Sequence, residues 1–149
     1  VEFRVAGHPK QALGALAKVA SGGELSRIAL AIQVVATEAG DVPTLVFDEV
    51  DSGIGGGVAE AVGRQLRKLG DNRQVLCVTH LPQVAAQAHQ QIKVEKRTDG
   101  ETTHTQVLPL EADERVAEIA RMLGGLELTA NTLAHAREMV EKAASPAAG

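Results

Sequence analysis

Two short apolar runs restrict the fold of this chain more than any other feature. The first is "TLVF" at residues 44–47, which two acids close, and the second is "VLCV" at residues 75–78. Such runs are typical of strands that are buried on both faces of a sheet. Between them, apolar residues at helical spacing predict a helix over 58–69 that ends at Gly70. This order predicts an α/β fold with a mainly parallel sheet flanked by helices.

Further elements are expected along the rest of the chain. Apolar spacing predicts a helix over 24–39, and Pro82 suits the first turn of a short helix through Ala88. Two extended runs on either side of Asp99-Gly100 predict a β-hairpin. The other predicted elements are a strand over 1–5, a loop over 7–20, and helices over 113–123 and 130–142. In the helix over 58–69, the residues expected to face the core are Val58, Ala61, Val62, Leu66 and Leu69.

The composition restricts both the core and the partners. Phe3 and Phe47 are the only aromatic residues among 149, so the core must be largely aliphatic. The formal net charge of −4 gives no overall basic field for nucleic-acid binding by this chain alone. We find no signal peptide and no apolar run near ~18 residues, so we expect no membrane partner. The single Cys77 fits a reducing compartment, and a first residue of Val1 leads us to expect a piece of a longer protein.

The stretch "SGGE" at residues 21–24 raises the first functional question. Ser21 and Glu24 have the spacing of a capping box at a helix N-terminus. Gly22 and Gly23 are not needed for a cap, and each costs about 0.5–1 kcal/mol in a helical turn. Glycines let a ligand approach the backbone, and the free N–H groups of a helix N-terminus favour a phosphate. Both a structural cap and a phosphate site remain open on these residues alone.

Acidic residues follow the first apolar run at the point where a strand should end. Asp48, Glu49 and Asp51 lie there, and His80 follows the second run. Ligands of open α/β sheets bind at the carboxyl ends of the strands, and Mg²⁺ in nucleotide sites is held by one or two carboxylates plus phosphate oxygens. Neighbouring carboxylates on a strand point to opposite sides, so one can face a metal ion and the other a water molecule. The alternative is a solvated strand end without a function.

One motif is missing. The chain has no G-x-x-x-x-G-K-[ST] sequence, and the glycines over 53–57 lack the lysine that would complete it. Without that phosphate cradle the chain cannot be a complete nucleotidase. We therefore expect it to be inactive by itself and to bind ATP weakly or not at all.

The motifs together resemble the second half of an ABC-type ATPase head. "ASGGELSR" resembles the signature motif, with Glu24 in place of the usual Gln as in the SMC-like branch. "TLVFDEVD" resembles a Walker B strand, "VDSGIGG" a D-loop and "VTH" the segment of the switch histidine. The stretches "CVTHLPQVAAQAHQ" and "IARMLGG" are similar to SMC-like ATPases of bacterial DNA double-strand-break repair.

The resemblance implies roles for individual residues. Asp48 would orient Mg²⁺, Glu49 would act as the general base for the attacking water, and His80 would contact the γ-phosphate of ATP. The other site residues would face a second copy of the head. Four of them would bind the ATP that this second copy holds, namely Ser21, Gly22, Gly23 and Glu24. Asp51 and Ser52 would lie at the dimer interface beside it.

The resemblance also implies an architecture and a function. Residues 1–149 would form the C-terminal lobe of an ABC/SMC-type P-loop NTPase head, and the N-terminal lobe with its Walker A motif and the coiled coil would lie outside them. The head would bind and hydrolyse ATP, dimerise around it, and drive DNA repair and recombination in the bacterial cytoplasm, at the nucleoid. The expected partners are the N-terminal half, a second head, and DNA through the complete protein. The alternative is an ATP-gated dimerisation clamp of another SMC-like or ABC ATPase.

Overall fold

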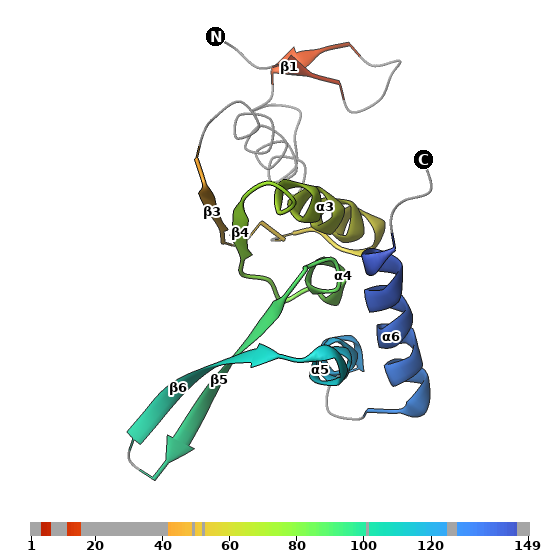
Figure 1. The fold of residues 1–149 in the computed structure, drawn as a ribbon. Helices are drawn as coiled ribbons and strands as arrows, with labels where there is room; N and C mark the ends of the chain where they lie inside the picture. The colour runs from red at the N-terminus through yellow and green to blue at the C-terminus, as the bar shows by residue number, and fades with distance from the viewer. Residues whose placement is uncertain are drawn as a thin grey trace.

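The computed structural model describes residues 4–6, 12–15, 42–48, 50–51, 53–100, 102–124 and 128–145 (Figure 1). The predicted helix over 24–39 lies outside these residues, and so do the first three residues of the predicted strand over 1–5. After two short strands near the N-terminus, the described elements alternate between strands and helices over residues 44–85 and then continue as a hairpin and two helices.

The strand–helix–strand unit at the centre of the chain confirms the predicted α/β class. Strand β3 (Thr44–Phe47) pairs in parallel with β4 (Gln74–Cys77), and helix α3 (Gly56–Leu69) connects them. Gly70 ends α3 as predicted, because its backbone N–H donates to the carbonyl of Leu66 at 3.0 Å. Three strand pairs occur among the described residues. The pair of β3 with β4 is parallel, and the other two pairs are antiparallel.

Helix α3 covers one face of β3 and β4. The predicted burial of these strands on both faces is wrong for this chain, because Val46, Leu76 and Val78 are 68%, 45% and 63% exposed. No other element in the described part of the chain covers that second face. The predicted inner position of Ala61 is also wrong, since Ala61 is exposed and Ala59 is buried instead. The first core cluster contains Phe47, Ala59, Val62, Leu66, Leu69 and Val84.

Helix α4 (Pro82–Ala85) is shorter than its prediction through Ala88. Pro82 lies in the first turn, as expected. The backbone leaves the helix after Ala85, and two arginines satisfy the free carbonyls there. Arg115 donates to the carbonyls of Ala86 at 2.9 Å and of Ala88, and Arg67 donates to that of Gln87 at 2.8 Å. These side chains come from α5 and α3, so the end of α4 is set by its neighbours.

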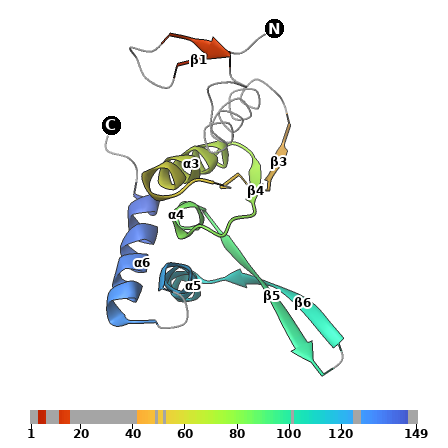
Figure 2. The same ribbon diagram turned by 180° about the vertical axis from the view of Figure 1, so that it is seen from behind.

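A long hairpin follows α4. Strands β5 (Gln91–Asp99) and β6 (Thr102–Leu110) pair antiparallel, and Gly100 has a φ of +61° in the predicted Asp-Gly turn. A positive φ at this position suits glycine. Figures 1 and 2 show the turn of this hairpin extending away from the helices.

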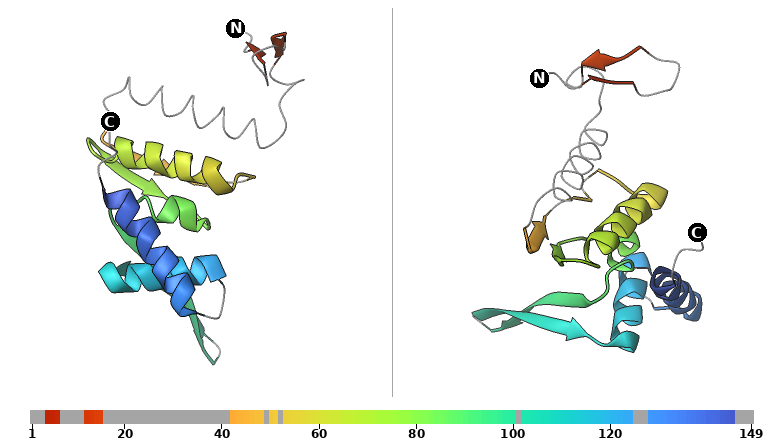
Figure 3. Two further views of the ribbon diagram at one scale, coloured as in Figure 1. Left: turned by 90° about the vertical axis from the view of Figure 1, so that its right-hand side faces the viewer. Right: turned by 45° about the horizontal axis from the view of Figure 1, so that its top comes forward.

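Helices α5 (Ala112–Gly124) and α6 (Ala130–Ala144) agree with the two predicted helices near the C-terminal end. Thr129 caps α6, since its side chain accepts from the Thr132 N–H at 3.1 Å. Figure 3 shows α6 crossing α5, and their apolar side chains meet those of Ala85 and Ala86 in a second core cluster. Within the described ranges, no helix combines the length and the apolar character that a membrane crossing requires.

A small antiparallel pair lies near the N-terminus. Strand β1 (Arg4–Val5) pairs with β2 (Gly14–Ala15). The predicted loop over 7–20 is therefore wrong at Gly14–Ala15. These residues lack an alternating pattern of their own, and the pairing with β1 makes them a strand.

Candidate functional site

The carboxyl ends of β3 and β4 lie at the same edge of the sheet. The register pairs Phe47 with Cys77, and the Val78 N–H donates to the Phe47 carbonyl at 2.9 Å. Asp48 follows β3 directly, and Thr79 and His80 follow β4 after Val78. The parallel pairing therefore brings the acidic strand end and the histidine strand end together, as the strand–helix–strand pattern predicted.

Asp51 is the most enclosed polar residue at this edge, with 2% of its surface exposed. Its Oδ2 atom accepts from the Thr79 hydroxyl and from the His80 backbone N–H at 3.0 Å, and the His80 Nδ1 atom lies 3.2 Å from the same oxygen. The Thr79 hydroxyl oxygen in turn accepts from the Leu81 N–H at 3.0 Å. We call Asp51, Thr79 and His80 the edge network.

The two ionisable side chains of the edge network differ in exposure. The side chain of His80 is 75% exposed, whereas that of Asp51 is 3% exposed. His80 presents its Nδ1 atom to the buried carboxylate of Asp51. One ring nitrogen thus lies close to the carboxylate, while most of the surface of the imidazole faces solvent.

Asp48 is exposed at the carboxyl end of β3. No group of three or more His, Cys, Asp or Glu side chains that could hold a metal ion occurs among the described residues. Mg²⁺ in nucleotide sites keeps several waters and takes one or two carboxylates together with phosphate oxygens. A single accessible carboxylate at a strand end fits that donor set.

Cys77 lies beside the same carboxylates but has the character of an inert thiol. Burial, and to a smaller extent the negative charges of Asp51 and Asp48, raise the pKa of Cys77 to about 11. The thiolate is the nucleophilic form of cysteine. The thiol of Cys77 is therefore poorly suited to act as a nucleophile near neutral pH.

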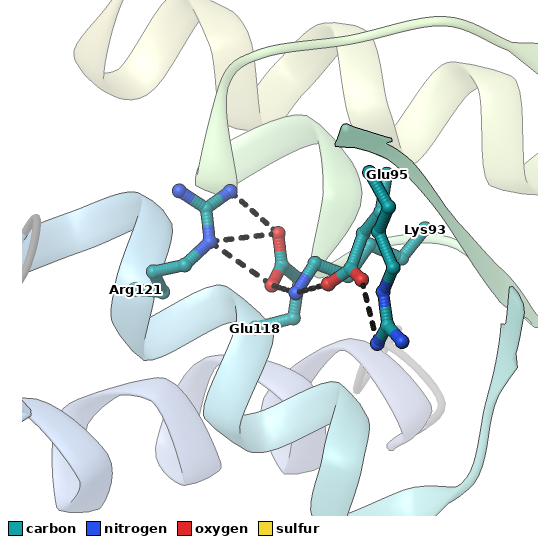
Figure 4. Close-up of polar contacts among 5 residues, drawn as sticks. Lys93, Glu95, Glu118 and Arg121 are labelled. Atoms are coloured by element: carbon teal, nitrogen blue, oxygen red, sulfur yellow. Dashed lines mark hydrogen bonds and ion pairs between the residues drawn. The ribbon is translucent and has the colours of Figure 1, made fainter. Parts of the chain in front are cut away.

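A second group of charged residues joins the hairpin to α5 (Figure 4). Glu118, which is 8% exposed, accepts from Arg121 at 2.6 Å and lies 3.1 Å from the Lys93 ammonium. Lys93 also lies 2.6 Å from Glu95. Burial alone would raise the pKa of Glu118, but the hydrogen bonds from Arg121 and Lys93 outweigh it and the pKa is lowered. We call Lys93, Glu95, Arg97, Glu118 and Arg121 the ion cluster.

The structure brings together three of the predicted site residues, namely Asp48, Asp51 and His80. Thr79 was missed, although a hydroxyl beside a histidine at a strand end was the available signal. The other predicted site residues lie outside the described residues, and they are Ser21, Gly22, Gly23, Glu24, Glu49 and Ser52.

Sequence comparison finds named proteins that are similar to nearly the whole chain. The chain is 55% identical over 140 residues to the DNA repair protein RecN of Vibrio cholerae, a match to 94% of this chain and 25% of that protein. It is 46% identical over 144 residues to RecN of Bacillus subtilis, which covers 96% of this chain and 25% of that protein. This chain is a relative of the RecN proteins. The predicted resemblance to SMC-like proteins of bacterial DNA repair is confirmed.

The match to RecN covers only part of each relative. This chain spans about a quarter of the length of the curated RecN proteins that it matches, and it matches 23% of RecN from Haemophilus influenzae at 56% identity. No family model matches the chain.

A solved structure gives an independent comparison of the fold. It is described as "Structural biochemistry of ATP-driven dimerization and DNA stimulated activation of SMC ATPases". The TM-score is 0.65 at 19% identity, over 79% of this chain and 70% of that chain. The RecN-like chain thus has the fold of an SMC ATPase, which confirms the predicted fold class.

Proposed function

We propose that this chain forms the C-terminal lobe of an ATP-hydrolysing head in a RecN-like DNA repair protein. The observation that carries the proposal is the parallel pairing of β3 with β4, which brings Asp48, Asp51 and His80 to one sheet edge. The RecN relatives are named as DNA repair proteins, and the structural neighbour is an SMC ATPase.

Each residue at the edge has a proposed role in hydrolysis. Asp48 holds Mg²⁺ directly or through water, and the ion neutralises charge on the phosphates when bound. Glu49 takes the proton of the attacking water, while His80 contacts the γ-phosphate. The exposed imidazole of His80 and the exposed carboxylate of Asp48 suit these roles.

A second copy of the head completes the proposed site. Residues 21–24, where the sequence predicts a helix N-terminus, bind the γ-phosphate of ATP held by that copy, with Ser21 and Glu24 on either side of the two glycines in the sequence. Asp51 and Ser52 lie beside it at the interface. Dimerisation is the subject of the work on the structural neighbour, which supports this part of the proposal.

The rest of the polypeptide supplies what this chain lacks. The uncovered face of β3 and β4, with Val46, Leu76 and Val78, suits packing by an N-terminal lobe that carries the Walker A motif. This chain alone then does not hydrolyse ATP, and DNA is engaged through the complete protein in the bacterial cytoplasm, at the nucleoid.

Glu49→Gln in the complete protein tests the proposal. We expect ATP binding to be kept and turnover to fall by about 10²–10⁴-fold, because a general base is lost. Glu60→Gln, which breaks ion pairs with Arg64 and Lys142 away from the edge network, should turn over ATP normally. Normal turnover by Glu49→Gln would refute the assigned base. Repair activity that persists without turnover would favour the ATP-gated clamp.

A further inference from the structure

Two hydrogen-bond donors and one ring nitrogen converge on a single oxygen atom in the edge network. The Thr79 hydroxyl, the His80 backbone N–H and the His80 Nδ1 atom all reach Oδ2 of Asp51. The two donors, the Thr79 hydroxyl and the His80 backbone N–H, are fixed by the backbone and by the turn that leads to α4, since Thr79 is itself held by the Leu81 N–H. The acceptor is therefore placed by the fold, and the imidazole is placed by the acceptor.

The position of Asp51 sets the state of the ring. A hydrogen on Nδ1 leaves Nε2 as the nitrogen that can face a ligand, because the two nitrogens lie on opposite sides of Cε1. The 75% exposed His80 side chain beside a 3% exposed carboxylate agrees with this orientation. Asp51 thus determines which nitrogen of His80 is available at the sheet edge.

We propose that Asp51 is a positioning residue for His80, which fixes the Nδ1–H tautomer and directs Nε2 away from the buried carboxylate. The proposal rests on the proposed function for its consequence, since the nitrogen directed outward is the one that would reach the γ-phosphate. It gives Asp51 a role within its own chain, in addition to the predicted role at the dimer interface. Thr79 supports it by holding the carboxylate in place.

The same chain contains a matched pair for comparison. Asp71 and His89 lie 3.3 Å apart, but both side chains are exposed, at 59% and 45%. Neither end of this pair is held as Asp51 is held by Thr79. Exposed pairs of this kind contribute little, so we expect no fixed tautomer at His89.

The direct test is the tautomer of His80 in the complete protein without ATP. The protein is labelled with ¹⁵N-histidine, the His80 signals are assigned with His80→Gln, and spectra are recorded at about pH 8, where imidazole is neutral. We expect the Nδ1–H form for His80. In Asp51→Asn the neutral amide oxygen is a weaker acceptor than the carboxylate and the NH2 group only donates, so we expect the ring to lose its preference and shift toward the Nε2–H form. Asp71→Asn should leave the His80 signals unchanged.

The functional test separates positioning from a structural role. We expect Asp51→Asn to lower kcat by about 10–100-fold with little change in KM for ATP, as for other residues that orient an active group. In the His80→Ala background the same substitution should have no further effect. Thr79→Val should share the loss and Thr79→Ser should restore turnover, which keeps the test decisive if Asp51→Asn folds poorly.

The outcomes distinguish this inference from the proposed function. An unchanged His80 tautomer in Asp51→Asn would overturn the inference, and so would an equal loss of kcat with and without His80. If the complete protein hydrolyses no ATP, the proposed function fails, but the tautomer measurement still decides the role of Asp51.

Discussion

Asp51 and Glu118 are both buried carboxylates, yet their surroundings differ in kind. They are 2% and 8% exposed and lie in the edge network and the ion cluster respectively. Asp51 accepts from a hydroxyl and a backbone N–H and lies beside an imidazole. Glu118 accepts from an arginine and lies beside a lysine, both of which stay charged near neutral pH (Figure 4).

The difference shows that burial of an acid does not by itself mark a functional site. In the ion cluster the positive charges balance the carboxylates and fasten β5 to α5. The edge network instead leaves a titratable ring, that of His80, exposed at the carboxyl ends of two parallel strands. The two regions therefore differ in the side chains that surround the buried carboxylate and in how far those side chains are exposed to solvent.

The largest expected effect separates two histidines. His80→Ala in the complete protein should lower ATP turnover by about 10²–10⁴-fold, because the ring is proposed to act on the reacting phosphate. His89→Ala, which removes the ring of the exposed pair with Asp71, should leave turnover unchanged. Steady-state ATPase assays of both variants measure this. Equal losses would show that His80 has no special place in hydrolysis.

The second prediction concerns stability, where the two regions should behave alike. Asp51→Ala and Glu118→Ala each leave donors without an acceptor, and each should lower the free energy of unfolding by about 1–3 kcal/mol. Only the first should also slow turnover. Denaturant unfolding measures the loss, with Asp71→Ala as the surface control. A variant of Glu118 that folds normally but loses turnover would contradict the distinction.

The third prediction uses the lowered pKa of Glu118. A carboxyl with a lowered pKa stabilises the fold above its usual pKa of 4.5, and this contribution is lost as the pH falls through the folded value. The difference in unfolding free energy between the wild type and Glu118→Gln should be full at neutral pH and shrink in acid below about pH 4.5. Urea titrations across this range test it. A constant difference would mean that the charge of Glu118 is not what stabilises the junction.

The smallest expected effect concerns Cys77. With a pKa of about 11, its thiol should react slowly with alkylating agents near neutral pH. Asp51→Asn removes one of the two charges that raise this pKa, so alkylation should become modestly faster. Burial is the larger cause and remains. Glu118→Gln should leave the rate unchanged, and equal acceleration by both variants would show that Asp51 has no specific influence on Cys77.

Much of the described fold follows from local patterns. Helical spacing and Gly70 predicted α3, and the Asp99-Gly100 pair predicted the hairpin turn. Errors occurred where a neighbour decides the outcome. Val46 and Leu76 are exposed because α3 covers one face of β3 and β4, and Gly14–Ala15 form a strand because β1 pairs with them.

Part of the candidate site was also predictable from local patterns in the sequence. Asp48 and His80 end apolar runs, and a parallel pairing of two such runs brings their ends together. Thr79 gave only a weak signal, and no local pattern shows that Asp51 folds back onto β4. That contact joins residues 28 and 29 positions apart.

The sequence by itself determined the order of the elements and the chemistry available at each strand end, because periodicity, caps and turns act over a few neighbouring residues. Only the tertiary structure decided which face of β3 and β4 is covered, and which nitrogen of His80 meets Asp51. A buried carboxylate must find its donors wherever the packed chain brings them, and those distances are set by the whole fold.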